Sequence, residues 1–301
     1  MSSSNSSAPS APTVPSVIVG VDGSPSAEYA LDWAVDEAAL RGAELRVVHA
    51  WPGEPPRLPL PDRADTEARG RVAASELLAA YADRAQARRP ELKVTSELIA
   101  GAPVAGLMEL AEGAGLLVVG SRGMNRFSSL VLGSVSHALA AHSPCPVVVT
   151  GSAHGGTSEA LGGPVILGVA PDEGAEPIGF AFAEAARRGA GLEAVRAWMA
   201  PQAYPGYMVV EPGDEARRNR VEGEQVESLL AAARKAAPDV PVATDVFLAE
   251  PEAALVAATE HAALLVVGAR RSRGRFPLPL GAVTSRVLQH AHCPVAVVPV
   301  R

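Results

Sequence analysis

The sequence repeats itself once at a nearly constant interval. Three matches carry the repeat: LLVVG at residues 116–120 and 264–268, VIVGVD at residues 17–22 against VILGVA at residues 165–170, and HAW at residues 49–51 against RAW at residues 196–198. The first two pairs are 148 positions apart and the third is 147 apart, which places the loss of one residue in the helix expected between the first two strands. A spacing maintained over nearly all of both halves predicts two homologous domains.

Composition and low-complexity stretches set the domain boundaries. We expect a first domain at residues 16–150 and a second at residues 164–301. Residues 151–163 are rich in Gly and polar residues without periodicity, which is typical of a linker. Residues 1–15 are rich in Ser, Pro and Ala and have neither a basic n-region nor an apolar h-region, so we expect a disordered tail and not a secretory signal.

The net charge of the chain argues against two classes of binding partner. The 301 residues are 48% hydrophobic, and 26 Lys and Arg face 33 Asp and Glu, giving a formal net charge of −7 that repels nucleic-acid phosphates and anionic lipids. Two cysteines are too few for a disulfide scaffold, and no run approaches the roughly 18 to 20 apolar residues of a membrane span. We therefore expect a cytoplasmic protein that binds neither nucleic acid nor membranes.

Short, continuous apolar runs alternate with amphipathic stretches in each half. The runs of the first half are residues 17–21, 45–50, 93–100, 116–119 and 146–149, and those of the second begin near Val165, Leu192, Val242, Leu264 and Val295. The helical stretches of the first half include the face Leu31, Ala34, Val35 and Ala38, residues 67–89 with Val72, Leu77, Leu78 and Tyr81 as apolar positions, and residues 105–112 and 134–142. This pattern predicts α/β architecture: two tandem Rossmann-like domains, each a five-stranded parallel sheet with helices on both faces.

The order 3-2-1-4-5 expected for such a sheet leaves the last strand of each half at an edge. The apolar edges at residues 147–149 and 295–298 need partners. We expect the two edges to pair within one chain, and further self-association to a dimer.

The chemistry is expected after strands one and four, because ligands of open parallel sheets bind beyond the carboxyl ends of the strands. Asp22 ends the first strand, and Gly120, Gly123, Gly133 and Ser134 follow the fourth. Glycines let main-chain amides approach a phosphate, and a helix opening at Ser134 would add its amino-terminal amides. An isolated Gly-x-x-Gly more often only makes turns, with Ser134 as a helix cap.

The full pattern G-x2-G-x9-G-[S/T] after strand four resembles the nucleotide loop of the universal stress protein superfamily, as do the Val-Asp-Gly-Ser end of strand one and the Cys-Pro-Val-Val-Val end of the first half. The resemblance extends over both halves and implies an ATP-binding protein of the stress response, with Mg²⁺ accompanying the nucleotide. It implies contacts from Asp22 and the main chain of Ala50 to adenine, and contacts to the phosphates from Gly120, Gly123, Gly133 and Ser134. Val119 and Val135 would add apolar or main-chain contacts.

The second half departs from this pattern. Ala170 stands for Asp22, and Gly123 and Ser134 are replaced by Arg271 and Ala282. We therefore expect ATP to bind the first half and to bind the second poorly or not at all. The arginines of residues 270–275 are either a charged anion site or, more commonly for such a run, a solvated basic loop.

Other chemistry finds weaker support in the sequence. A zinc site at His290, His292 and Cys293 lacks a second, separated ligand pair, so no metal site is expected. Ser134 and His137 lack an orienting carboxylate and the nucleophile elbow G-x-S-x-G, so no catalytic residue is expected. The leading interpretation is a nucleotide-dependent sensor without strong catalysis, acting on an unknown regulatory partner. The alternatives are an interaction scaffold that holds no nucleotide and a slow ATPase.

Overall fold

The computed structural model describes residues 15–51, 63–121, 132–151, 162–199, 214–270 and 280–300. The elements of the first half are β1 (Val17–Val21), α1 (Pro25–Arg41), β2 (Leu45–Trp51), α2 (Arg63–Arg88), β3 (Val94–Ala100), α3 (Pro103–Ala111), β4 (Leu116–Gly120), α4 (Ser134–His142) and β5 (Val147–Thr150). The elements of the second half are β6 (Val165–Gly168), α5 (Ala175–Arg188), β7 (Leu192–Trp198), α6 (Asp214–Ala236), β8 (Val242–Leu248), α7 (Pro251–Ala258), the 3₁₀ helix η2 (Thr259–His261), β9 (Leu264–Arg270), α8 (Ala282–His290) and β10 (Val295–Val300). The alternation of strands and helices confirms the α/β prediction for both halves.

The strands form one ten-stranded sheet in the order β3-β2-β1-β4-β5-β10-β9-β6-β7-β8. Within each half the neighbours are parallel, in the predicted order 3-2-1-4-5. The last strands of the two halves meet in the middle as an antiparallel pair, with Ala296 opposite Val148. The predicted pairing of the two edges within one chain is confirmed, whereas dimerisation of the whole chain stays a prediction.

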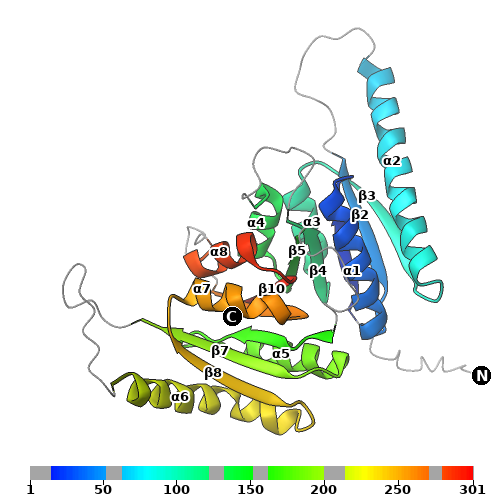
Figure 1. Cartoon of the computed structure of the whole chain (residues 1–301). Coiled ribbons are helices and arrows are strands. Elements are labelled where there is room, and N and C mark those ends of the chain that lie inside the picture. The colour runs from blue at the N-terminus through cyan, green and yellow to red at the C-terminus, as the bar shows by residue number, and fades with distance from the viewer. Residues whose placement is uncertain are drawn as a thin grey trace, which may run out of the picture.

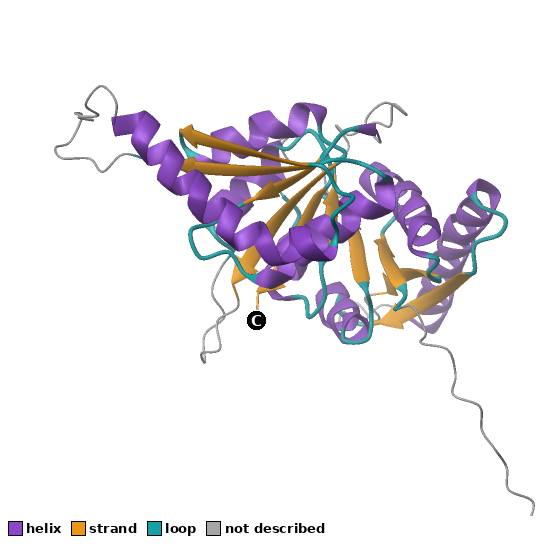
Figure 2. Cartoon of the chain, turned by 90° about the horizontal axis from the view of Figure 1, so that it is seen from below, coloured by secondary structure: helices purple, strands orange, loops and turns teal. Residues whose placement is uncertain are grey.

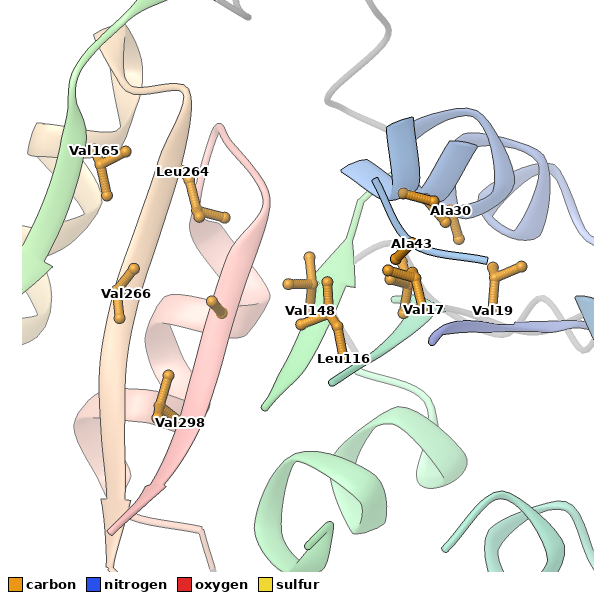
Figure 3. Packing of buried hydrophobic residues seen from close by; sticks show 14 of the residues in the cluster. Val17, Val19, Ala30, Ala43, Leu116, Val148, Val165, Leu264, Val266 and Val298 are labelled. Carbon is orange, nitrogen blue, oxygen red and sulfur yellow. The ribbon is translucent and has the colours of Figure 1, made fainter. Parts of the chain in front are cut away.

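Helices cover both faces of this sheet (Figure 2). One face packs against α1, α2, α5 and α6, and its core is a single cluster that includes Val17, Val148 and Val266 from both halves (Figure 3). The other face packs against α3, α4, α7 and α8 around residues such as Ile18 and Leu265. Strands covered on both faces explain why their sequences are continuous apolar runs and do not alternate.

Most sequence-based element boundaries are within a residue or two of those observed. The predicted buried face of α1, formed by Leu31, Ala34, Val35 and Ala38, is fully buried. Val72 is a correction, because its side chain is 56% exposed. The buried stripe of α2 runs through Ala74, Leu78, Tyr81 and Ala85, and the amino-terminal part of the helix extends beyond the strands (Figure 1). No helix within the described segments is long and apolar enough to cross a bilayer.

A buried cluster of charges joins α1 to α5 where the two halves meet. Arg41 pairs with Glu37 of its own helix at 2.5 Å and with Glu184 of α5, and Arg188 pairs with Glu184 of its own helix and with Glu37 at 2.5 Å. Arg187 adds a further contact to Glu184 at 2.5 Å. The side chains of Glu37 and Glu184 are 1% and 0% exposed, so each carboxylate depends on these guanidinium groups for its neutralisation.

The cluster follows the repeat of the sequence. Glu37 and Arg41 correspond to Glu184 and Arg188, each 147 positions later, so the two cross-helix ion pairs are related by a pseudo-two-fold axis. Burial works to raise the pKa of Glu37, but Arg188 and Arg41 outweigh burial and lower that pKa. Each arginine also lies over an aromatic ring of the other half. Arg41 is 5.5 Å from the ring centroid of Phe180, and Arg188 is 5.8 Å from that of Trp33.

Replacing Glu184 by Ala removes one of the two buried carboxylates and leaves Arg41 and Arg188 with Glu37 alone. We expect this substitution to lower the free energy of unfolding by about 3–5 kcal/mol. The control is Glu44→Ala, which removes an exposed pair with Lys93 and costs less than about 1 kcal/mol. Chemical unfolding of the full chain measures both, and a loss at Glu184 as small as that at Glu44 contradicts this role for the cluster.

Candidate functional site

The first strand ends in a tight turn that orients its acid toward the start of α1. Asp22 Oδ1 accepts a hydrogen bond of 3.0 Å from the main-chain N–H of Ser24. Gly23 between them has φ of +85°, which favours glycine at this position. Ser24 is the N-cap of α1, and its hydroxyl accepts a bond of 3.2 Å from Ala27 N. Asp22 therefore sits at a strand tip whose geometry is fixed by main-chain contacts.

The second strand is tied to the first at the same edge of the sheet. His49 Nδ1 lies 2.7 Å from the carbonyl oxygen of Val21, so this nitrogen carries the proton and donates it. Ala50, the next residue, lies one place inside the end of β2 and is partly exposed. Trp51 packs so closely against Gly70 of α2 that a Cβ at Gly70 would collide with the indole ring. Trp51 is thus a packing residue at the end of β2.

Three hydrogen bonds fix the end of the fourth strand, one to the end of β5 and two to the start of α4. Ser121 N donates to Thr150 O at 2.7 Å, and Gly133 N donates to Ser121 O at 2.8 Å. The hydroxyl of Ser136 donates to the carbonyl of Gly120 at 2.6 Å. These contacts place the amino-terminal end of α4 directly beside the tip of β4.

The first turn of α4 shows part of the arrangement that we expect of a phosphate-binding loop. Gly133 is the N-cap and Ser134 the first residue of the helix, so the alternative in which Ser134 caps the helix is wrong. The Ser134 side chain is exposed, Val135 is partly buried, and Val119 is buried within β4. Gly123 lies outside the described residues, as do the flanking arginines of that loop.

Most of the predicted residues therefore lie along one edge of the sheet. Asp22, Ala50, Val119 and Gly120 belong to the carboxyl ends of adjacent strands β1, β2 and β4, and Gly133, Ser134 and Val135 begin α4. This edge is where the strand order reverses between β1 and β4, the position at which open α/β sheets bind ligands.

Two hydroxyl groups that the sequence analysis missed lie at the same edge. Ser121 Oγ and Thr150 Oγ1 are buried and have no hydrogen-bond partner among the described residues. A buried hydroxyl without a partner is unfavourable unless a water or ligand satisfies it. The second half has Ala269 and Val298 at the equivalent positions, so these hydroxyls are specific to the first half. That difference between halves was the signal available in the sequence.

Tyr81 of α2 lies near the carboxylate of Asp22 at the tip of the first strand. Burial, together with the nearby carboxylates of Glu28 and Asp22, raises the pKa of Tyr81 to about 12. The phenol therefore stays protonated at neutral pH and adds no charge to the site.

The corresponding edge of the second half is arranged differently. Ala170 replaces the acid at the tip of β6, and the carboxylate of Glu173 turns back over the loop. Glu173 Oε2 accepts a hydrogen bond of 3.0 Å from Ala170 N, and Oε1 accepts one of 3.3 Å from Gly174 N. Its Oε1 lies so close to Gly268 that a Cβ there would collide with it.

The register of the repeat explains why Glu173 was overlooked. The C-caps of α1 and α5 are Gly42 and Gly189, 147 positions apart, and the buried positions of the two helices match at this offset. On that register Glu173 corresponds to Ser26, which occupies the same place against Gly120 in the first half. The missing residue therefore lies in the loop before the helix, which corrects the expectation that it was lost within the helix.

Ion pairs stabilise the other strand tips of the second half. Arg196, at the position of His49, donates to the carbonyl of Val169 at 3.1 Å and pairs with Glu222 of α6 at 2.7 Å. Arg270 at the end of β9 pairs with Asp172. The rest of the arginine-rich segment, including Arg271, lies outside the described residues, as do the proline-rich segments that follow β2 and β7.

The cysteines belong to the core. Cys145 and Cys293 are both buried where the last strand of each half begins, and burial raises the pKa of Cys293 to about 12. His292 Nδ1 lies 3.4 Å from the hydroxyl of Thr259. Over the described ranges, no three His, Cys, Asp or Glu side chains come together as a metal site would require.

The fold and the position of its candidate site define a tandem protein of two doubly wound α/β domains. The chain belongs to the universal stress protein family: the profile of that family matches residues 14–151 and 163–299. The resemblance noted from the sequence motifs is confirmed for both halves.

Relatives with the same tandem organisation match almost the whole chain. Universal stress protein Rv2005c of Mycobacterium tuberculosis is 34% identical over 291 residues, covering 93% of this chain and 96% of the relative. Universal stress protein Rv2623 of the same organism is 33% identical over 305 residues, covering 99% and 98%. A solved universal stress protein from Archaeoglobus fulgidus is 20% identical with a TM-score of 0.68, covers 94% of this chain and 98% of its own, and supports the fold.

Gly120 lies so close to α1 that adding a methyl group at this position should lower the stability of the fold. A Cβ at Gly120 would lie 2.6 Å from Ser26 Oγ and 2.7 Å from the Ser26 carbonyl. We expect Gly120→Ala to lower the free energy of unfolding by about 1–3 kcal/mol as the start of α1 shifts. Gly113→Ala, where a Cβ meets nothing within 4 Å, is the control and should change stability little. Equal thermal stability of the two variants argues against this packing.

The buried carboxyl of Glu173 predicts a pH dependence of stability. Burial raises its pKa above 4.5, outweighing the hydrogen bonds from Ala170 and Gly174. A group with a raised pKa stabilises the fold fully below its unfolded pKa, and this contribution is lost as pH rises through the folded pKa. The melting temperature of Glu173→Gln relative to the wild type should therefore increase between about pH 4 and about pH 7.

Glu44 supplies a control of opposite sign for this measurement. Hydrogen bonds from Lys93 and Thr95 lower its pKa, so its contribution is present above the unfolded pKa and lost as pH falls. The melting temperature of Glu44→Gln relative to the wild type should decrease over the same rise in pH. A difference for Glu173→Gln that is flat, or that follows Glu44→Gln, contradicts the assignment.

Proposed function

We propose that the first domain binds an adenine nucleotide, ATP with Mg²⁺, at the edge formed by β1, β2, β4 and α4. The observation that carries this proposal is the pair of buried hydroxyls, Ser121 and Thr150, that lack partners among the described residues next to the loop beginning at Gly120. Polar groups of this kind fit a phosphate-bearing ligand, whose oxygens accept hydrogen bonds.

The arrangement of main-chain groups supports a triphosphate beside α4. The amino-terminal amides of a helix carry positive partial charge and no intrahelical partner. At α4 they begin behind a glycine N-cap that brings no side chain, and the exposed hydroxyl of Ser134 lies beside them. Gly120, Gly123 and Gly133 would let the main chain approach the phosphates, with Mg²⁺ held by phosphate oxygens and water.

The base would lie at the tips of β1 and β2. Asp22 offers a carboxylate positioned by its bond to Ser24, and the main chain of Ala50 lies on the adjacent strand. Val119 and Val135 would add apolar or main-chain contacts beside these residues. This assignment follows the family resemblance, residue by residue.

The site favours binding over turnover. The first turn of α4 contributes hydroxyls and one imidazole, His137, for which the described residues provide no carboxylate partner. Since the described residues provide neither a base to activate water nor a clamp of cations, we expect any hydrolysis of a bound nucleotide to be slow. We infer a cytoplasmic regulator whose nucleotide state, and not catalysis, is read by other proteins of the stress response.

Calorimetry tests the binding. The nucleotide-stripped full chain should bind ATP at one site per chain, and Gly123→Arg should weaken the affinity at least about tenfold, or about 1.4 kcal/mol. The reason is that an arginine side chain occupies the place where main chain and phosphate approach each other.

The matched control is Gly113→Arg. Gly113 lies in the exposed turn before β4, at the opposite edge of the sheet, so the same chemical change there should leave the affinity for ATP unaltered. The absence of heat and of a thermal shift at millimolar ATP would falsify the proposal, and equal effects of the two arginines would show that the loop is misassigned.

A further inference from the structure

The chain itself places an acidic side chain at the strand tips of the second domain. The carboxylate of Glu173 accepts hydrogen bonds from the main-chain amides of Ala170 and Gly174, at 3.0 Å and 3.3 Å. It also presses against Gly268, the last glycine of the LLVVG run. These contacts lie at the strand-order reversal of the second half, between β6 and β9.

The same place in the first domain holds a neutral group. Ser26 lies against Gly120, and its hydroxyl is 3.1 Å from that of Ser24. The acid of the first domain, Asp22, is instead one strand tip away and accepts from Ser24 N. The second domain has thus lost the acid proposed to read the base and gained one beside the glycine proposed to face phosphate.

A neighbouring arginine side chain is also already paired with an acid. Arg270 ends β9 immediately after Gly268 and Ala269, where it could attract a phosphate, but it pairs with Asp172 of the same loop. Of the two acids on residues 170–174, Asp172 is thus paired with Arg270, and Glu173 lies against Gly268. Like charges repel strongly at short range in a partly buried site.

The carboxylate satisfies main-chain amides at the start of α5, including that of the N-cap Gly174, but burial opposes its charge. An acid that caps a helix gains from its charge, and its pKa falls. Burial instead raises the pKa of Glu173 despite the two amide bonds and the nearby Arg196. The fold holds the ionised form less favourably than water does, so the charge at this position lowers stability at neutral pH.

We propose that Glu173 is a specificity residue: its carboxylate excludes phosphate-bearing ligands from the second domain. The inference rests on the proposed function, since it takes the equivalent edge of the first domain as the nucleotide site. It adds an active block to the asymmetry expected from the replacements at Ala170, Arg271 and Ala282.

Amide signals of glycine report the two domains separately. In the full chain labelled with ¹⁵N-glycine, Gly120 and Gly133 report the first domain, and Gly268 and Gly281 report the second. Each sample is titrated with ATP and, separately, with sodium tripolyphosphate, which has no base. The variants are Glu173→Ser, which copies Ser26, and Glu173→Gln, which keeps the shape of the side chain but removes its charge.

We expect wild-type Gly268 and Gly281 to respond weakly to tripolyphosphate. In both Glu173 variants, the shifts of these two signals should saturate at a concentration at least about tenfold lower than in the wild type. The control is Glu176→Gln, which removes an exposed acid from the first turn of the same helix and should behave as the wild type.

Equal responses of wild type and Glu173→Ser overturn the inference, whether both signals shift or neither does. A gain in Glu173→Ser without a gain in Glu173→Gln overturns the electrostatic explanation, because bulk and not charge would then be the block. Failure of the proposed function has a different signature: Gly120 and Gly133 would not respond to ATP in the wild type.

Discussion

The antiparallel pairing of β5 with β10 is the constraint on which the rest of the molecule depends. Each half alone is a parallel sheet with an apolar strand at its edge, and that edge is satisfied only by the matching strand of the other half. Because the pair is antiparallel, all strands of one half run against those of the other. The two strand-order reversals therefore lie at opposite ends of the strands of one continuous sheet.

The charge cluster between α1 and α5 reinforces the same junction from one face. Burying Glu37 and Glu184 carries a large desolvation cost, and the paired arginines offset part of it only in one relative position of the helices. An apolar contact tolerates sliding, whereas four charges related by a pseudo-two-fold axis do not. The cluster thus specifies how the halves meet, while the strand pairing and the shared core supply most of the buried apolar surface.

The sequence predicted the fold well because strands buried on both faces leave continuous apolar runs and because the repeat doubles every signal. The residues that the family resemblance assigned to the site lie together because adjacent parallel strands end at a common edge, and their role in binding stays a prediction. The sequence failed where tertiary packing decides. The burial of Val72 depends on where α2 leaves the sheet, and the partnerless hydroxyls of Ser121 and Thr150 become visible only when β4 and β5 lie side by side. Glu173 was missed because a fixed offset of 148 aligns it with no residue of interest.

The backbone has pseudo-two-fold symmetry, but the side chains at the strand tips of its two halves differ. The strand tips of the first half present the Asp22 carboxylate, hydroxyls and helix amides, whereas those of the second half present Glu173 bound to main-chain amides and Arg270 paired with Asp172. A rotation that superimposes the strands therefore exchanges chemically different surfaces. The two ends of the molecule along the strand direction therefore differ chemically. A partner that binds at one end contacts different groups from a partner that binds at the other.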